Sequence, residues 1–127
     1  MRRTTFAALL LAGSAAGIPL GFALSQVTPR MRVEVLLQRI VGDIPQPTNL
    51  QVREDRWEPG AETGVHDHPG PVILAIIEGE LVEETPTGRK TLRTGQVFWR
   101  AAHQTHNVKN AGARPARALA IHFDPIQ

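Results

Sequence analysis

The chain has 127 residues and no cysteine, which leaves room for one folded domain and a short leader and excludes a disulfide framework. Arg2 and Arg3 are two of its 14 Lys and Arg residues, so residues 26–127 carry 12 basic and 12 acidic side chains. This balance excludes a polybasic surface, and with it nucleic acid as a partner. We expect a homodimer, because a domain of about 100 residues buries only a modest part of its surface.

The first 25 residues have the three parts of a bacterial secretory signal. A charged start is followed by an apolar run over residues 6–24 and by small residues spaced as a cleavage site that ends at Ser25. Cleavage there would leave a domain of residues 26–127. The apolar run is nearly long enough to remain as a membrane anchor, but Pro19 and three glycines weaken it as a helix, so we favour cleavage. With either outcome we expect an exported protein, periplasmic or secreted.

Short strands separated by glycine and proline turns are predicted along the rest of the chain. Residues 32–44 alternate as a half-buried strand does; an amphipathic helix is the alternative, and the abundance of β-branched residues favours the strand. The apolar run at 72–77 is typical of a strand buried on both faces. Further strands or extended segments are expected at 49–57, 65–68, 81–85, 89–93, 97–100, 104–109 and 117–123. About eight to ten strands in all predict an all-β sandwich or barrel.

Four of the five histidines lie in two short clusters on either side of the 72–77 run. His66 and His68 are two residues apart, so in an extended segment both imidazoles point to the same face. Two such rings reach one metal ion at about 2.0 to 2.1 Å with modest tilting. His106 lies on a later segment that a hairpin could bring opposite, which makes it the candidate third ligand. A chance grouping of surface histidines near loop ends is the alternative, and spacing alone leaves both open.

The spacing of glycines and histidines resembles that of a small single-domain cupin. The first cupin motif has Gly, five residues, His-x-His, three or four residues, Glu, six residues and Gly, and its matches here are Gly60, His66, His68 and Gly79. The second has Gly, five residues, Pro-x-Gly, two residues, His, three residues and Asn, and its matches are Gly95, His106 and Asn110. The resemblance implies a cupin double-stranded β-helix, a jelly-roll barrel, over residues 26–127. It also implies a metal held by His66, His68 and His106.

Two positions depart from the cupin pattern. Val72 stands where the pattern has its glutamate ligand, and Ala101-Ala102-His103 replaces Pro-x-Gly. The chain therefore resembles a quercetinase-like, three-histidine cupin without the glutamate. Three neutral imidazoles leave the charge of a divalent ion uncompensated, which favours water, hydroxide or an anionic substrate at the open positions.

Other polar residues are candidates for lesser roles. Gln104 would face the same way as His106, as a weak fourth ligand, a hydrogen-bond donor to a bound substrate, or an ordinary polar residue at the barrel mouth. His103 is a candidate general base, with a solvated loop histidine as the alternative. His122 is interpreted as a support for the ligands or as structural. Support for the ligand histidines and ordinary solvation are likewise both open for Glu62 and Asp67.

These features together predict an exported metal-binding cupin with a small-molecule ligand. The first hypothesis is a dioxygenase-like oxidoreductase that uses one divalent metal, Fe, Mn, Cu, Ni or Zn, on a small enolic, phenolic or carboxylate substrate. An apolar lining of Val72, Leu74 and Ile76 would suit such a substrate. The alternative is a non-catalytic module that binds or senses a small ligand, which the missing glutamate favours. A metal-free structural cupin is a third possibility, against which the three histidines argue.

Overall fold

The computed structural model describes residues 16, 17, 21 and 27–127, of which Val33–Gln127 form one compact unit. The signal predicted over residues 1–25 lies almost wholly outside the described residues and stays a prediction. In the described part the regular elements are all strands: β1 (Thr48–Trp57), β2 (Val72–Glu78), β3 (Glu80–Thr85), β4 (Gly88–Arg93), β5 (Val97–Arg100), β6 (Asn107–Lys109) and β7 (Ala116–Pro125). No helix in these described residues is long and apolar enough to span a membrane. The expected all-β fold is confirmed.

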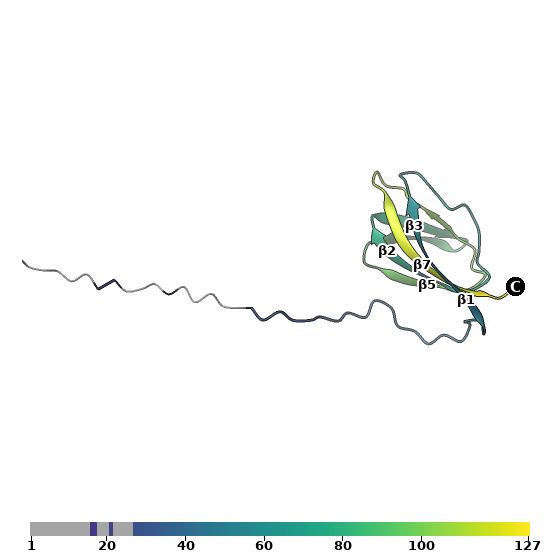
Figure 1. The fold of residues 1–127 in the computed structure, drawn as a ribbon. Coiled ribbons are helices and arrows are strands. Elements are labelled where there is room, and N and C mark those ends of the chain that lie inside the picture. Colours follow the sequence, from purple (N-terminus) through teal and green to yellow (C-terminus); the bar gives the residue numbers. More distant parts are fainter. Residues whose placement is uncertain (1–15, 18–20, 22–26) are drawn as a thin grey trace, which may run out of the picture. The chain divides into compact units, whose positions relative to one another are not determined.

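Two antiparallel sheets pack face to face (Figure 1). The larger has the strand order β1-β7-β2-β5, and the smaller has the order β4-β3-β6. The last strand, β7, thus lies between the first two, β1 and β2, as expected for a jelly roll. The two sheets enclose one apolar core, made of Trp57, Val72, Leu74, Ile76, Leu81, Leu92, Val108, Ala116, Ala118 and Ala120.

The larger sheet buries one face only. Along β2, Val72, Leu74 and Ile76 point into the core, whereas Ile77 is 37% exposed. The prediction that residues 72–77 are buried on both faces is wrong, because only the inward face meets the second sheet. Leu50 and Val52 on β1 are also exposed, at 57% and 60%. The expected homodimer stays a prediction, to which this apolar outer surface would offer an interface.

Residues 32–44 form neither the favoured strand nor the alternative helix. Val33 is 76% exposed and Ile40 is fully exposed, so the apolar alternation does not mark a buried face. The segment pairs with no strand of either sheet, and β1, at the edge of the larger sheet, pairs with β7 alone. Residues 65–68 also form no strand and contribute only an isolated bridge at His66. These two segments explain why the described residues contain seven strands and not about eight to ten.

Two residues of the cupin-like motifs have structural roles. Gly79 makes the turn between β2 and β3 with φ of 71°, and a Cβ at this position would lie 2.5 Å from the carbonyl oxygen of Pro115. Both facts require glycine. Asn110 is buried, and its amide donates hydrogen bonds to the carbonyl oxygens of Trp57 and Arg114 at 3.2 and 2.6 Å. It thereby joins the end of β1 to the loop that leads into β7.

A close approach at Gly70 holds the His66–His68 loop against the end of β7. A Cβ built on Gly70 would lie 1.9 Å from the carbonyl oxygen of Phe123 and 2.9 Å from the Cα of Asp124. Next to it, the backbone N–H of Phe123 donates to the carbonyl of Pro71 at 3.0 Å. The backbones are therefore in direct contact with no space for a side chain.

We predict that Gly70→Ala lowers the free energy of unfolding by about 3 kcal/mol, because the added methyl overlaps backbone that cannot move freely. Urea unfolding followed by circular dichroism measures the effect. Gly42→Ala is the matched control, since a Cβ there meets nothing within 4 Å, and it should change stability by no more than about 0.5 kcal/mol. Equal stability of the two variants would contradict the close packing at Gly70.

Candidate metal centre

Backbone pairing brings the two histidine clusters together. His66 and His106 form an antiparallel bridge in which the N–H of each donates to the carbonyl of the other, both at 2.9 Å. The N–H of His103 donates to the carbonyl of His68 at 2.8 Å and extends this link. The loop before β2 and the segment before β6 are thus joined at the residues whose imidazoles were predicted to share a site.

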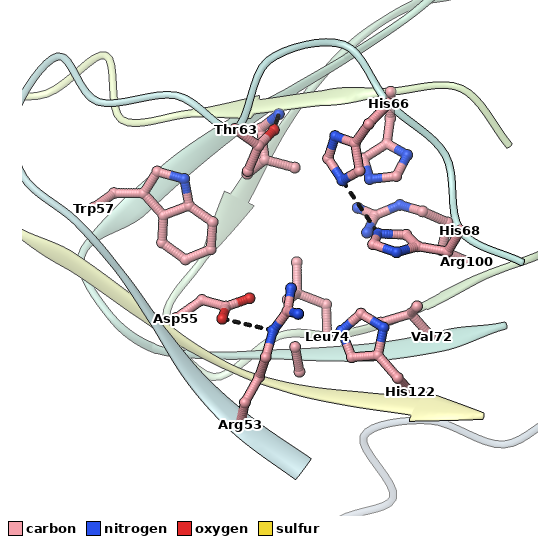
Figure 2. Close-up of a pocket in the computed structure, with 13 residues that line it drawn as sticks. Arg53, Asp55, Trp57, Thr63, His66, His68, Val72, Leu74, Arg100 and His122 are labelled. Atoms are coloured by element: carbon pink, nitrogen blue, oxygen red, sulfur yellow. Dashed lines mark hydrogen bonds and ion pairs between the residues drawn. The ribbon is translucent and has the colours of Figure 1, made fainter. Parts of the chain in front are cut away.

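The imidazoles of His66, His68 and His106 converge in the structure (Figure 2). One ring nitrogen from each lies within 4.8 Å of the others, and the two Nε2 atoms of His66 and His68 are 3.2 Å apart. Nitrogens bound to one metal ion at about 2.0 to 2.1 Å lie roughly 3 to 4 Å from one another. Small rotations of the rings would therefore bring all three nitrogens to a single ion.

Hydrogen bonds to the backbone orient two of these rings. The Nδ1 atoms of His66 and His106 lie 2.8 Å and 2.7 Å from the carbonyl oxygens of Gly64 and Gln104. A carbonyl can only accept, so each Nδ1 carries the proton and each Nε2 keeps its lone pair for a metal. The donor set present fits a divalent transition metal bound by imidazole.

Burial favours the neutral form of two of the rings, His68 and His106. Burial lowers the pKa of His68 to about 4, and the neighbouring His122, His66 and His106 add to the effect. Burial also lowers the pKa of His106, which outweighs the hydrogen bond to Gln104. At neutral pH these imidazoles are therefore uncharged, the form in which they bind metals.

The three rings open on a cavity of about 30 Å³ between the sheets. Val72, Leu74 and Trp57 supply apolar walls, but Ile76, expected in this lining, lies in the core outside it. A void of this size accommodates an ion and about one water-sized group. The cavity is therefore too small for the organic ligand that an apolar lining was expected to hold.

A larger groove of about 520 Å³ reaches His66 and His68 from outside. Its walls include Arg53, Asp55 and Thr63, all of which also line the inner cavity. Arg53 and Asp55 form an ion pair at 2.8 Å, seen in Figure 2 on the side of the cavity away from His66. This groove provides the space for a small molecule that the inner cavity does not.

The minor candidates lie elsewhere. Gln104 contacts His106 through its backbone carbonyl, and its side chain lines a separate outer pocket. His103 has a side chain that is 73% exposed, with its Nδ1 3.6 Å from a carboxylate oxygen of Asp67. The carboxylate of Glu62 accepts a hydrogen bond at 2.8 Å from Asn107, so among the described contacts it supports β6 and not a ligand histidine.

His103 also explains one departure from the cupin pattern. It stands at the glycine position of Pro-x-Gly and has φ of 59°, the left-handed conformation that glycine adopts most readily. The turn shape is thus retained without the glycine. Its exposed ring is consistent with the solvated loop histidine that was one of the two interpretations.

Two residues of the cavity were not anticipated in their present roles. His122, interpreted from the sequence as support or structure, lines the cavity with its ring centroid 4.9 Å from that of His68. Arg100 lines it too, and its Nε donates to Glu83 at 2.8 Å in a buried ion pair. Burial raises the pKa of Glu83, but Arg100 and Lys90 outweigh burial and the net pKa is lowered. The alternation of side chains along the strands could have identified both residues, since each occupies an inward-facing position of its strand.

Comparisons with known proteins agree with this architecture. The chain is 45% identical over 65 residues to beta-alanine degradation protein BauB of Pseudomonas aeruginosa, covering 49% of this chain and 68% of that protein. A cupin domain from Bordetella pertussis is 32% identical, with a TM-score of 0.53 over 59% of this chain and 81% of that one. A Thermus thermophilus structure, 23% identical with a TM-score of 0.56 over 76% and 100% of the two chains, shares the fold. The family described as "Cupin domain" matches residues 54–122, more than half of the sequence, and the chain belongs to this family.

Proposed function

We propose that this cupin holds one divalent transition metal through His66, His68 and His106. The observation that carries the proposal is the convergence of one nitrogen from each ring within 4.8 Å. Backbone carbonyls hold Nδ1 of two of these rings, so their Nε2 atoms keep the lone pair that a metal would take. When bound, the metal would act as a Lewis acid or a redox centre at its open positions.

The proposed ligand is a small molecule with a carboxylate, enolate or phenolate group. Only its binding atoms would fit the cavity of about 30 Å³, while its body would lie in the groove of about 520 Å³. Arg53 and Arg56 line this groove, although each is also paired with an acid, Asp55 at 2.8 Å and Glu54 at 2.6 Å. The name of the Pseudomonas relative refers to beta-alanine degradation, and a small carboxylate would be in keeping with that context.

The site would support either a dioxygenase-like reaction or ligand binding without turnover. Asp55 is the one carboxylate among the described residues that line the cavity, and it is engaged in an ion pair with Arg53. Glu83, nearby, is committed to Arg100 and Lys90. The lack of a free base favours ligand binding without turnover. A substrate that is already an anion needs no base, however, and would be compatible with the dioxygenase-like reaction.

We predict about one metal ion per chain, by elemental analysis of protein purified from its native compartment or reconstituted without oxygen. His66→Ala and His106→Ala should each lose the metal, with affinity falling by more than the roughly 10 to 100-fold typical of an outer-shell partner. His103→Ala is the matched control, because its ring is exposed and outside the cavity. Circular dichroism checks that each variant is folded. Unchanged metal content in His106→Ala would contradict the site.

Oxygen consumption separates the two functional classes. With the metal-loaded protein and a panel of small carboxylates, enols and phenols, we expect uptake that follows metal content and disappears in His66→Ala. An oxygen electrode measures the rate, and the His103→Ala variant serves again as the control. Ligand binding without uptake across the panel would instead assign the chain to the binding class.

We also propose that residues 1–25 direct export. Their charged start, apolar run and small residues before Gln26 support this proposal. Mass spectrometry of the protein from fractionated cells should find a chain that begins at Gln26 outside the cytoplasm. An intact chain in the membrane fraction would indicate an anchor over residues 6–24, and an intact cytoplasmic chain would overturn the proposal.

A further inference from the structure

Val72, at the position of the absent glutamate, has a polar residue directly beside it on each neighbouring strand. In the larger sheet it pairs with His122 of β7 on one side and with Arg100 of β5 on the other. Side chains of directly paired residues point to the same face, with Cβ atoms about 4.5 to 5.5 Å apart. All three residues are buried and line the cavity next to the histidines. The place of the missing carboxylate is therefore flanked by an imidazole and a guanidinium.

Only the imidazole is available as a ligand. Arg100 carries no acceptor and is already bonded to Glu83. His122 is 3% exposed, and among the described residues its Nε2 has no hydrogen-bond partner. Buried polar atoms are nearly always paired, so this nitrogen calls for a partner that the described part of the chain does not provide.

The His122 ring lies beside the candidate metal centre. Its ring centroid lies 4.9 Å from that of His68, with the ring planes at 72°. Figure 2 shows the His122 ring in the cavity beside Val72 and Leu74, on the side of His68 away from His66. Valine in place of glutamate leaves the space between the β7 histidine and the other three imidazoles free of a competing carboxylate.

We infer that His122 is the fourth protein ligand of the metal, binding through Nε2 in place of the glutamate that Val72 does not supply. This inference rests on the proposed metal site. His122 is outside the group whose nitrogens lie within 4.8 Å, so its side chain would turn toward the ion as the metal binds. The resulting site has four neutral imidazoles and no carboxylate. Such a donor set suits Cu, Ni, Zn or Fe better than the harder Mn.

The charge of this site has a consequence for its ligand. Four neutral imidazoles leave the full double positive charge of the ion inside the barrel, and Arg100 lies at the same cavity. Asp55, which lines the cavity, and Glu83, which binds Arg100, are each bonded to a cation. An anion is therefore the favoured occupant of any position that the protein leaves open.

Pulsed EPR of the full-length protein loaded with one equivalent of Cu(II) tests this assignment, because it counts coordinated imidazoles. The His103→Ala background removes an exposed histidine as a competing site. We expect four imidazoles in this background, three after adding His122→Ala, and Cu(II) binding at least about tenfold weaker. A competition titration measures the affinity, and circular dichroism verifies folding. His122→Phe, which fills the space without a donor, should give the same result if the alanine variant unfolds.

Restoring the cupin pattern provides the complementary test. Val72→Glu added to His122→Ala places a carboxylate directly across from the lost imidazole, and it should recover Cu(II) affinity with three coordinated imidazoles. If His122→Ala leaves both affinity and imidazole count unchanged while His66→Ala loses the metal, His122 is not a ligand and the three-histidine site stands. Three imidazoles both with and without His122, at reduced affinity, would make it a positioning residue and also overturn the inference. Metal retained in His66→Ala would overturn the metal site itself.

Discussion

The reciprocal backbone hydrogen bonds between His66 and His106 are the constraint on which the candidate site depends. They join a loop that precedes β2 to a segment that precedes β6, although neither participant belongs to a long strand. The link positions the backbone of both residues, and carbonyls of Gly64 and Gln104 then orient the rings. Main-chain geometry therefore sets the direction of the ligand nitrogens, and a side-chain change nearby would disturb it less than a change in chain path.

The interior near the histidines is organised around neutral donors and paired charges. Burial favours the uncharged form of the His68 and His106 imidazoles, and the buried Arg100 is paired with Glu83. Position 72 lies directly opposite Arg100 on β5, whose guanidinium is already bonded to Glu83. Valine there leaves this ion pair undisturbed and places no carboxylate beside the β7 imidazole.

Small side chains decide how the available volume is divided. Ala116, Ala118 and Ala120 occupy the inward positions of β7, where larger residues would fill the space between the sheets. The cavity nevertheless stays near 30 Å³ because Trp57, Leu74 and Val108 pack into it. The larger groove lies outside, where Arg53 and Asp55 meet solvent. In the proposed function, coordination and ligand recognition are separated, with the inner cavity for the ion and the outer groove for the body of a small molecule.

The sequence by itself determined the all-β class, most strand positions and the grouping of His66, His68 and His106, because strand alternation and turn residues are local properties of the chain. It failed at residues 32–44, where the same alternation has no neighbouring strand to pair with. It also could not place His122 beside Val72, since that register pairs residues 50 positions apart in the chain. Cavity size, the Arg100 ion pair and the unpaired Nε2 of His122 were decided only by the tertiary structure. The ion pair joins β5 of one sheet to β3 of the other, and the surroundings of His122 depend on how β7 lies between β1 and β2.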